Sequence, residues 1–212
     1  MDYGGVQIDF PVTVWNWLCG KLQNGDSDVE ELSLNYITKH NYGLFEHRFN
    51  ERNFKNKATW FSALPEIMCL VVLSELQKEQ LVKDRWQILK SSNLYIEGIF
   101  IEYPSVEGIF NQPLNCQLFG FAWAKQNVNI IGEECFREIQ RATVQLMATN
   151  MKLFWSTYNT GRIASPFYNL LHLDQLNCCG LIERKMLEKK LILHYALTPL
   201  IIILKIISRV YS

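Results

Sequence analysis

The chain has 212 residues, and its 21 Lys and Arg are balanced by 21 Asp and Glu. This length suffices for one large domain or two small ones, each able to bury a core. A dedicated nucleic-acid-binding protein usually carries a basic surface, so the zero net charge excludes a chain that is basic throughout. The six cysteines form no C-x-x-C pair, and the N-terminus lacks a charged-then-apolar signal pattern. These features predict free thiols, no metal site and a cytoplasmic location.

The first half of the chain is predicted to be helical with one short strand. Residues 27–40 follow a turn-forming stretch and carry acids in the first turn, as helices favour. Residues 64–91 form the longest helical pattern, opened by Pro65. Residues 94–103 are rich in Tyr, Ile and Phe and stop at Pro104, which predicts a strand.

A domain boundary is predicted near residue 112, where prolines and glycine interrupt the apolar pattern. Residues 1–112 are then a helical region with a short strand, and residues 113–212 are a long helix plus a C-terminal unit. The long helix is predicted over residues 133–158 from its amphipathic spacing. Residues 117–124 fit either a strand or the start of a helix.

The last fifty residues contain the most specific pattern. Leucines recur three residues apart between positions 170 and 176, which predicts a helix that begins at Ser165-Pro166, and Gly180 supplies the helix stop. Residues 181–197 then fit a strand, a charged turn and a second strand. Thr198-Pro199 fits the start of a closing helix, because threonine caps helices and proline suits their first turn.

Two motifs in this unit resemble a known family. They are Gly180-Leu181-Ile182-Glu183-Arg184 and Tyr195-Ala196-Leu197-Thr198-Pro199-Leu200, which resemble the "G-L-I-x-R … Y-x-L-T-P-x-G" pattern of bacterial winged-helix regulators, with Ile201 at the last glycine. The resemblance implies a recognition helix before Gly180, a wing formed by the hairpin after it, and DNA binding in transcription regulation. The predicted fold class is mainly α with small β: a helical N-terminal portion plus a C-terminal winged helix-turn-helix.

A second, looser resemblance covers roughly the last ninety residues. Trp123-Ala124-Lys125, the long helix and the unit around Gly180 resemble uncharacterised bacterial domains associated with abortive infection. This resemblance implies a role in antiviral defence or regulation.

Charge is unevenly distributed along the chain. Residues 161–212 hold seven Lys or Arg against three acids, an excess of four positive charges, so the rest of the chain carries four negative ones. This asymmetry fits either a DNA-contacting wing or a solvated hairpin. Under the DNA hypothesis the basic side chains contact phosphates and the amides read base edges. The candidate DNA-binding residues are Gln175, Asn177, Arg184, Lys185, Lys189 and Lys190.

No catalytic motif occurs, since the chain has no glycine-rich phosphate loop, H-E-x-x-H or G-x-S-x-G. A non-enzymatic protein without a cofactor is predicted, and His172 and His194 are interpreted as surface or half-buried residues. Besides binding double-stranded DNA as a dimer, the chain could pair subunits through residues 200–207 without DNA. It could also attach to a membrane through residues 191–207. The membrane alternative is the least favoured, because Pro199 interrupts a run shorter than the roughly 20 residues that a spanning helix needs.

Overall fold

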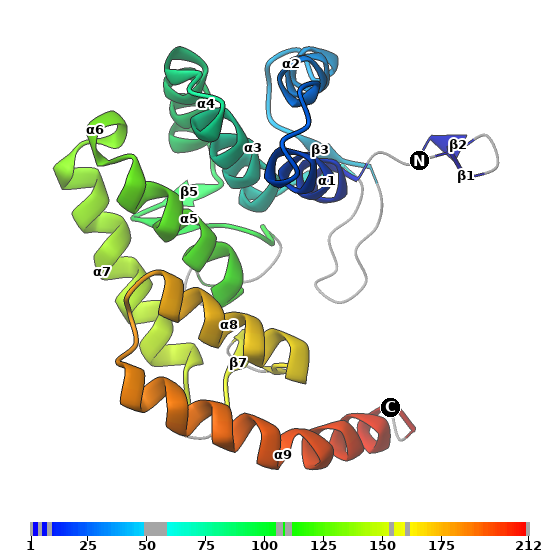
Figure 1. The fold of residues 1–212 in the computed structure, drawn as a ribbon, viewed down its shortest axis with the longest axis vertical. Coiled ribbons are helices and arrows are strands. Elements are labelled where there is room, and N and C mark those ends of the chain that lie inside the picture. Colours follow the sequence, from blue (N-terminus) through cyan, green and yellow to red (C-terminus); the bar gives the residue numbers. More distant parts are fainter. Residues whose placement is uncertain are drawn as a thin grey trace.

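The chain is mainly helical with a few short strands (Figure 1), which confirms the predicted fold class of mainly α with small β. The structure is a computed structural model, and it describes residues 2–3, 6–7, 10–48, 59–104, 108, 112–152, 155–159 and 162–210.

The helices and strands follow one another in small units. The helices are α1 (Pro11–Gln23), α2 (Val29–Lys39), α3 (Ala63–Glu75), α4 (Glu79–Ser91), α5 (Leu114–Gln126), α6 (Val128–Ile131), α7 (Glu133–Asn150), α8 (Pro166–Cys178) and α9 (Arg184–Val210). The antiparallel strand pairs are β1 (Asp2–Tyr3) with β2 (Val6–Gln7), β3 (Glu46–His47) with β4 (Trp60–Phe61), β5 (Tyr95–Ile96) with β6 (Ile99–Phe100), and β7 (Thr157–Asn159) with β8 (Arg162–Ile163).

The main core surrounds α3, which packs against α1, α4 and α5. The helix is apolar on almost every side, as expected for a helix enclosed by others. Trp15, Trp86 and Trp123 are among its largest buried side chains. Cys135 of α7 and Cys179 after α8 belong to the same cluster, so the boundary predicted near residue 112 does not separate two cores.

A buried ion pair fixes the segment between α2 and β3 to this core. The Arg85 guanidinium donates to the Glu66 carboxylate and to the carbonyl oxygens of Tyr42 (3.1 Å) and Gly43 (2.7 Å). Glu66 also accepts from the Phe45 N–H at 2.7 Å. Burial raises the pKa of the Glu66 carboxyl, and Arg85 opposes that shift. Removing either charge would leave the other buried and uncompensated.

Several predicted boundaries change in the first half of the chain. The helix over residues 27–40 is confirmed as α2. The helical stretch 64–91 is divided into α3 and α4 by a turn in which Gln77 has φ +57°. The predicted strand 94–103 is a tight hairpin, β5–β6, that turns at Glu97 and Gly98, both at positive φ. These turns are local backbone reversals, which apolar periodicity does not report.

Gly98 is required where this hairpin meets α7. A Cβ at this position would lie 2.6 Å from the backbone carbonyl oxygen of Glu138. The Gln117 side chain completes the junction, because its amide donates to the Gly98 carbonyl oxygen and accepts from the Phe100 N–H. Residues 117–124, for which strand and helix were both possible, therefore lie on helix α5 and anchor the hairpin.

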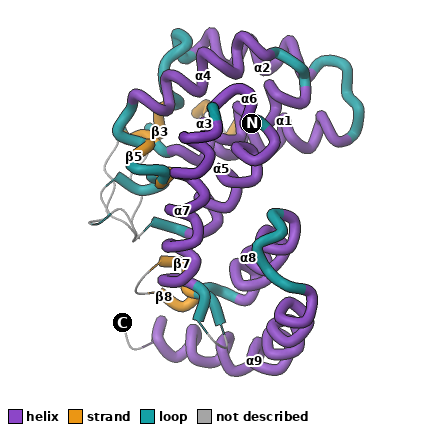
Figure 2. The backbone as a smooth tube through the Cα atoms, turned by 90° about the vertical axis from the view of Figure 1, so that its left-hand side faces the viewer, coloured by secondary structure: helices purple, strands orange, loops and turns teal. Residues whose placement is uncertain are grey.

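Helix α8 begins and ends where the sequence predicts. The Ser165 hydroxyl caps it by accepting from the Tyr168 N–H, Pro166 occupies the first turn, and Gly180 follows it at φ +68°. Helix α7, which precedes α8, is shorter than predicted, and it ends at Asn150 instead of residue 158. The chain then forms the β7–β8 hairpin beside α8 and α9 (Figure 2).

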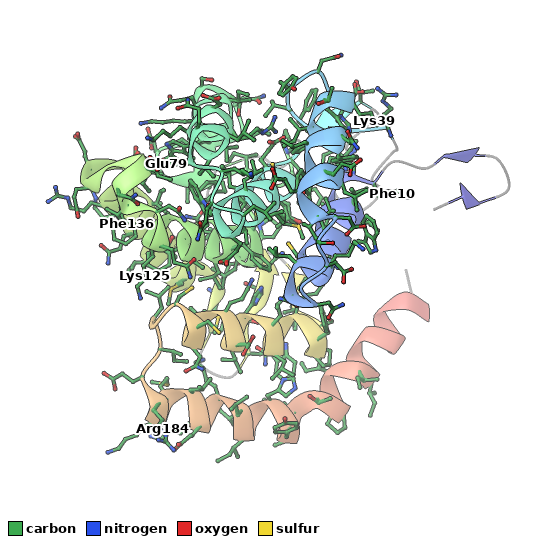
Figure 3. All side chains as sticks on the ribbon, turned by 45° about the horizontal axis from the view of Figure 1, so that its top comes forward. Phe10, Lys39, Glu79, Lys125, Phe136 and Arg184 are labelled. Atoms are coloured by element: carbon green, nitrogen blue, oxygen red, sulfur yellow. The ribbon has the colours of Figure 1, made fainter. Side chains whose placement is uncertain are left out.

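The predicted wing is wrong, because residues 184–210 form one helix, α9. Its first turns consist of good helix formers, and Arg184 pairs with Glu188 one turn later at 3.0 Å. Thr198-Pro199 therefore lies inside the helix instead of starting one. Proline removes one helical hydrogen bond and crowds the preceding turn, which accounts for the bend of α9 in Figure 3.

Candidate interaction surface

One side of α9 packs on the rest of the molecule. His194 and Ile201 are buried on this side, and Ile201 joins a small apolar cluster with Trp155 and Ala164. Helix α8 is the main element against which α9 packs. Figures 1 and 2 show α9 at the edge of the molecule, with α8 between it and the N-terminal helices.

The opposite side of α9 is an apolar stripe that no described residue covers. At about 100° per residue, positions 192, 196, 199 and 203 follow one line along the helix, opposite His194 and Ile201. The exposed fractions on and beside this line are 69% for Ile192, 69% for Tyr195, 52% for Leu200, 45% for Ile202 and 53% for Ile203. Contiguous exposed apolar residues, unlike scattered ones, mark interaction surfaces. We call the exposed positions between 192 and 203 the outward stripe.

The same line is charged in the first half of α9. Lys185, Glu188 and Lys189 are exposed there, so α9 has ordinary solvated turns before Ile192 and apolar ones after it. The apolar residues 200–207 are predicted to pack against the helix over residues 133–158 or a second subunit, with a membrane as the alternative, and the side chains of residues 204–207 lie outside the described residues. Of these, Ile201 is buried within the chain, whereas Leu200, Ile202 and Ile203 face outward. Within the described residues, no helix has both the length and the apolar character to cross a membrane.

The predicted base-reading position Gln175 is wrong. Its side chain is buried, and its amide donates to the Asn115 carbonyl oxygen at 3.4 Å in the contact between α8 and α5. A buried side chain on a helix enclosed by neighbours cannot reach the base edges of a duplex. Asn177, two residues later, is exposed near the end of α8.

The predicted phosphate contacts lie on helix α9 instead of a hairpin. Lys185 and Lys189 are exposed, and Arg184 projects from the start of α9 (Figure 3), although it pairs with Glu188. Lys190 is half-buried, and its ammonium donates to the Lys152 carbonyl oxygen at 2.9 Å. The structure thus brings Arg184, Lys185 and Lys189 together on one end of α9, and their contact with DNA stays a prediction.

A buried polar network joins α8, α9 and the β7–β8 hairpin. The Asn169 side-chain carbonyl accepts from the Ser156 N–H and from the Ser156 hydroxyl, each at 2.9 Å. Asn169 Nδ2 lies 3.0 Å from Nδ1 of His194, and Ser156 Oγ lies 2.9 Å from Nδ1 of His172. The Trp155 ring stacks on His194 at 5.3 Å between centroids.

Both histidines are buried, so their interpretation as surface or half-buried residues is wrong. Burial lowers the pKa of His172 to about 4 and also lowers the pKa of His194, because a buried imidazolium loses its hydration. Sequence reasoning missed the network because its members are 38 positions apart along the chain, from residue 156 to 194. One signal existed: Asn169 and His172 are three residues apart, on one face of the predicted helix.

A groove of about 650 Å³ lies between α1, α3 and α5. Its lining includes Cys19, Met68, Phe119 and Trp123. Burial raises the pKa of the Cys19 thiol, so the reactive thiolate is disfavoured at neutral pH. Among the described lining residues Glu75 is the one carboxylate, and no paired acid and base converge in the groove.

The geometry therefore offers two distinctive features in the C-terminal third of the chain, the outward stripe and the buried histidine network behind it. Comparison of the chain with protein-family models, with curated proteins and with solved structures gave no match.

Proposed function

We propose that this chain is a non-enzymatic interaction module that pairs with a second copy of itself through the outward stripe of α9. The observation that carries the proposal is the change of one helix face from charged to apolar at Ile192, on the side opposite α8. An apolar side chain of this size gains roughly 1.5–3 kcal/mol between full exposure and full burial, so the partly exposed side chains of the stripe gain part of that when covered. Covering the stripe with a partner therefore has a lower free energy than leaving it exposed to water.

The stripe is self-complementary in the antiparallel direction, which favours a second copy over an unrelated partner. A two-fold axis between residues 197 and 198 would place apolar positions of one copy opposite apolar positions of the other, as an isologous interface requires. Lys189 would then lie beyond the apolar pairs, beside residue 206, without facing another lysine. The facing pairs would be Ile192 with Ile203, Tyr195 with Leu200, and Ala196 with Pro199.

Charge variants of the full chain test the pairing. Ile203→Glu places a carboxylate in the stripe, and we expect it to raise the dimer dissociation constant at least about tenfold, since burying an unpaired charge costs more than 1.4 kcal/mol. Val144→Glu on α7 is the matched control, because Val144 and Ile203 are both 53% exposed. Sedimentation across a concentration series measures the constant. A natural chain that stays monomeric, or equal weakening by both variants, would contradict the proposal.

Binding of the same purified full chain to duplex DNA, measured at several salt concentrations, tests the DNA hypothesis. Arg184, Lys185 and Lys189 would give an affinity for duplex DNA that falls as salt is added. Reversing Lys185 and Lys189 to Glu should then abolish DNA binding and leave pairing through the stripe intact. Duplex binding by a chain that does not pair would replace the proposed function with the DNA function.

A further inference from the structure

The hydrogen bonds of the buried network have one consistent assignment. The Ser156 N–H can only donate, so the atom of Asn169 that it meets must be the carbonyl oxygen. The other atom, Nδ2, then donates to Nδ1 of His194, which must carry no proton. The Ser156 hydroxyl also gives its proton to Asn169, so it can only accept from Nδ1 of His172. His194 is therefore the neutral tautomer with its proton on Nε2, and His172 carries a proton on Nδ1.

Neither histidine can take up a second proton within this arrangement. A proton on Nδ1 of His194 would face the two N–H groups of the Asn169 amide. A second proton on His172 would reside at Nε2, which is buried and has no hydrogen-bond partner among the described residues. In both cases a charged donor would be buried without an acceptor, which is among the most costly arrangements in a folded chain.

The described residues that contact the two histidines supply no compensating negative charge. Among the described residues, the hydrogen-bond and ring partners of the two histidines are Ser156, Asn169, Trp155, and the rings of Tyr168 and Tyr195. None of these is a carboxylate. Lys190, one turn before His194 on α9, adds a positive charge at the Lys152 carbonyl.

We propose that the Ser156–Asn169–His172–His194 network is a proton-operated latch that holds α9 on α8 at neutral pH and releases it on acidification. Release of α9 is the expected response, because His194 lies on this helix and the apolar cluster that includes Ile201 is small. Once α9 is free, His194 can be solvated and charged, and the proposed release opens the rest of the network so that His172 can be charged as well. The inference stands on the network itself, and only its consequence for pairing rests on the proposed function.

Release has a direct consequence for the outward stripe. The docked helix presents one apolar side, whereas a released helix also exposes the side that carries Leu197 and Ile201. Acidification would therefore change the surface through which the chain pairs, in the manner of known histidine switches.

Hydrogen exchange of the full chain tests the latch. Between about pH 7.5 and about pH 5, we expect the opening equilibrium of the amides in residues 184–203 to rise about 30-fold, after correction for intrinsic exchange, while the amides of α3 stay unchanged. The factor follows from His172, whose pKa of about 4 lies well below the usual 6.5. Equal changes in α3 and α9, or none in α9, would overturn the proposal.

Two variants show whether protonation, and not a loss of packing, opens α9. In His172→Asn/His194→Asn, one amide donates where His172 donates and the other accepts where His194 accepts, but neither can be protonated, so the pH effect on α9 should vanish. In Asn169→Asp, the new carboxylate oxygen accepts from a protonated His194, so α9 should become less open as pH falls. An unchanged pH response in both variants would refute the latch.

The two proposals fail separately. If Ile203→Glu does not alter sedimentation but exchange in α9 rises with acid, the pairing is refuted and the latch stands. If pairing is confirmed while α9 exchange is insensitive to pH in the natural chain, the latch is refuted and the pairing stands.

Discussion

The N-terminal core and the joint between α8 and α9 differ in how their buried polar groups are compensated. The core contains a charged pair, Glu66 with Arg85, in which each charge compensates the other. The joint contains two histidines whose pKa values are lowered by burial and whose described partners include no counter-charge. A compensated pair does not tolerate the loss of a partner, whereas a neutral network tolerates neither added protons nor lost acceptors. The two regions should therefore respond to different perturbations.

The largest effect is expected from breaking the charged pair in the core. Arg85→Met would leave the Glu66 carboxylate buried without its partner, which typically costs about 3–5 kcal/mol of unfolding free energy. Urea unfolding at neutral pH measures the loss. Adding Glu66→Gln to Arg85→Met should recover a large part of it, because the remaining group is neutral. A double variant as unstable as the single one would show that the charge is not the cause.

The next effect concerns the joint and its pH dependence. The folded chain keeps His172 neutral down to about pH 4, while the unfolded chain binds a proton near 6.5. The unfolded state therefore binds more protons between these values, so stability is complete above about pH 6.5 and decreases as pH falls toward 4. The full difference is about 3 kcal/mol for this residue. The measurement is the difference in unfolding free energy between the natural chain and His172→Asn at each pH in this range. A difference that does not change with pH would show that His172 is not the cause.

The sequence supports the predictions that depend on a few neighbouring residues. Ser165, Pro166 and Gly180 bound α8 as expected, because caps and stops act within a few residues. The lysine-rich stretch before Ile192 is helical instead of the predicted turn, and the sequence does not separate the two because charged helix formers also suit an exposed turn. The spacing of the packed positions indicates a helix. On the side of α9 that packs, buried or half-buried side chains recur at helical spacing, at residues 187, 191, 194, 197 and 201. This period favours a helix over a strand.

The site itself was less predictable than the helices. Lys185 and Lys189 were correctly predicted to be exposed, but Gln175 is buried by the contact of α8 with α5. The network needs Ser156 beside Asn169 and His194, and this proximity depends on how the β7–β8 hairpin packs. Such contacts follow from tertiary packing, which local patterns in a single sequence do not encode.

A smaller effect is expected from Asn169→Ala, which sharpens the comparison by removing the acceptor of the joint without adding charge. The Ser156 N–H and the His194 Nδ1 atom would then be buried without partners, at a cost of about 2 kcal/mol. Because the loss is confined to the joint, amide exchange in α9 should increase more than exchange in α3. Equal increases in the two helices would mean that the joint and the core unfold as one unit.

The smallest effects come from glycines, and they should differ in sign between the two regions. Gly20 lies on α1, and a Cβ there would meet nothing within 4 Å, so Gly20→Ala should stabilise the chain by about 0.5–1 kcal/mol through helix propensity. Gly180 ends α8 at φ +68°, where alanine is strained, so Gly180→Ala should destabilise it by about 1 kcal/mol. Thermal unfolding of the two variants should give melting temperatures on opposite sides of the natural chain. A stabilising Gly180→Ala would show that the turn between α8 and α9 does not need the left-handed conformation, and so does not fix where α9 begins.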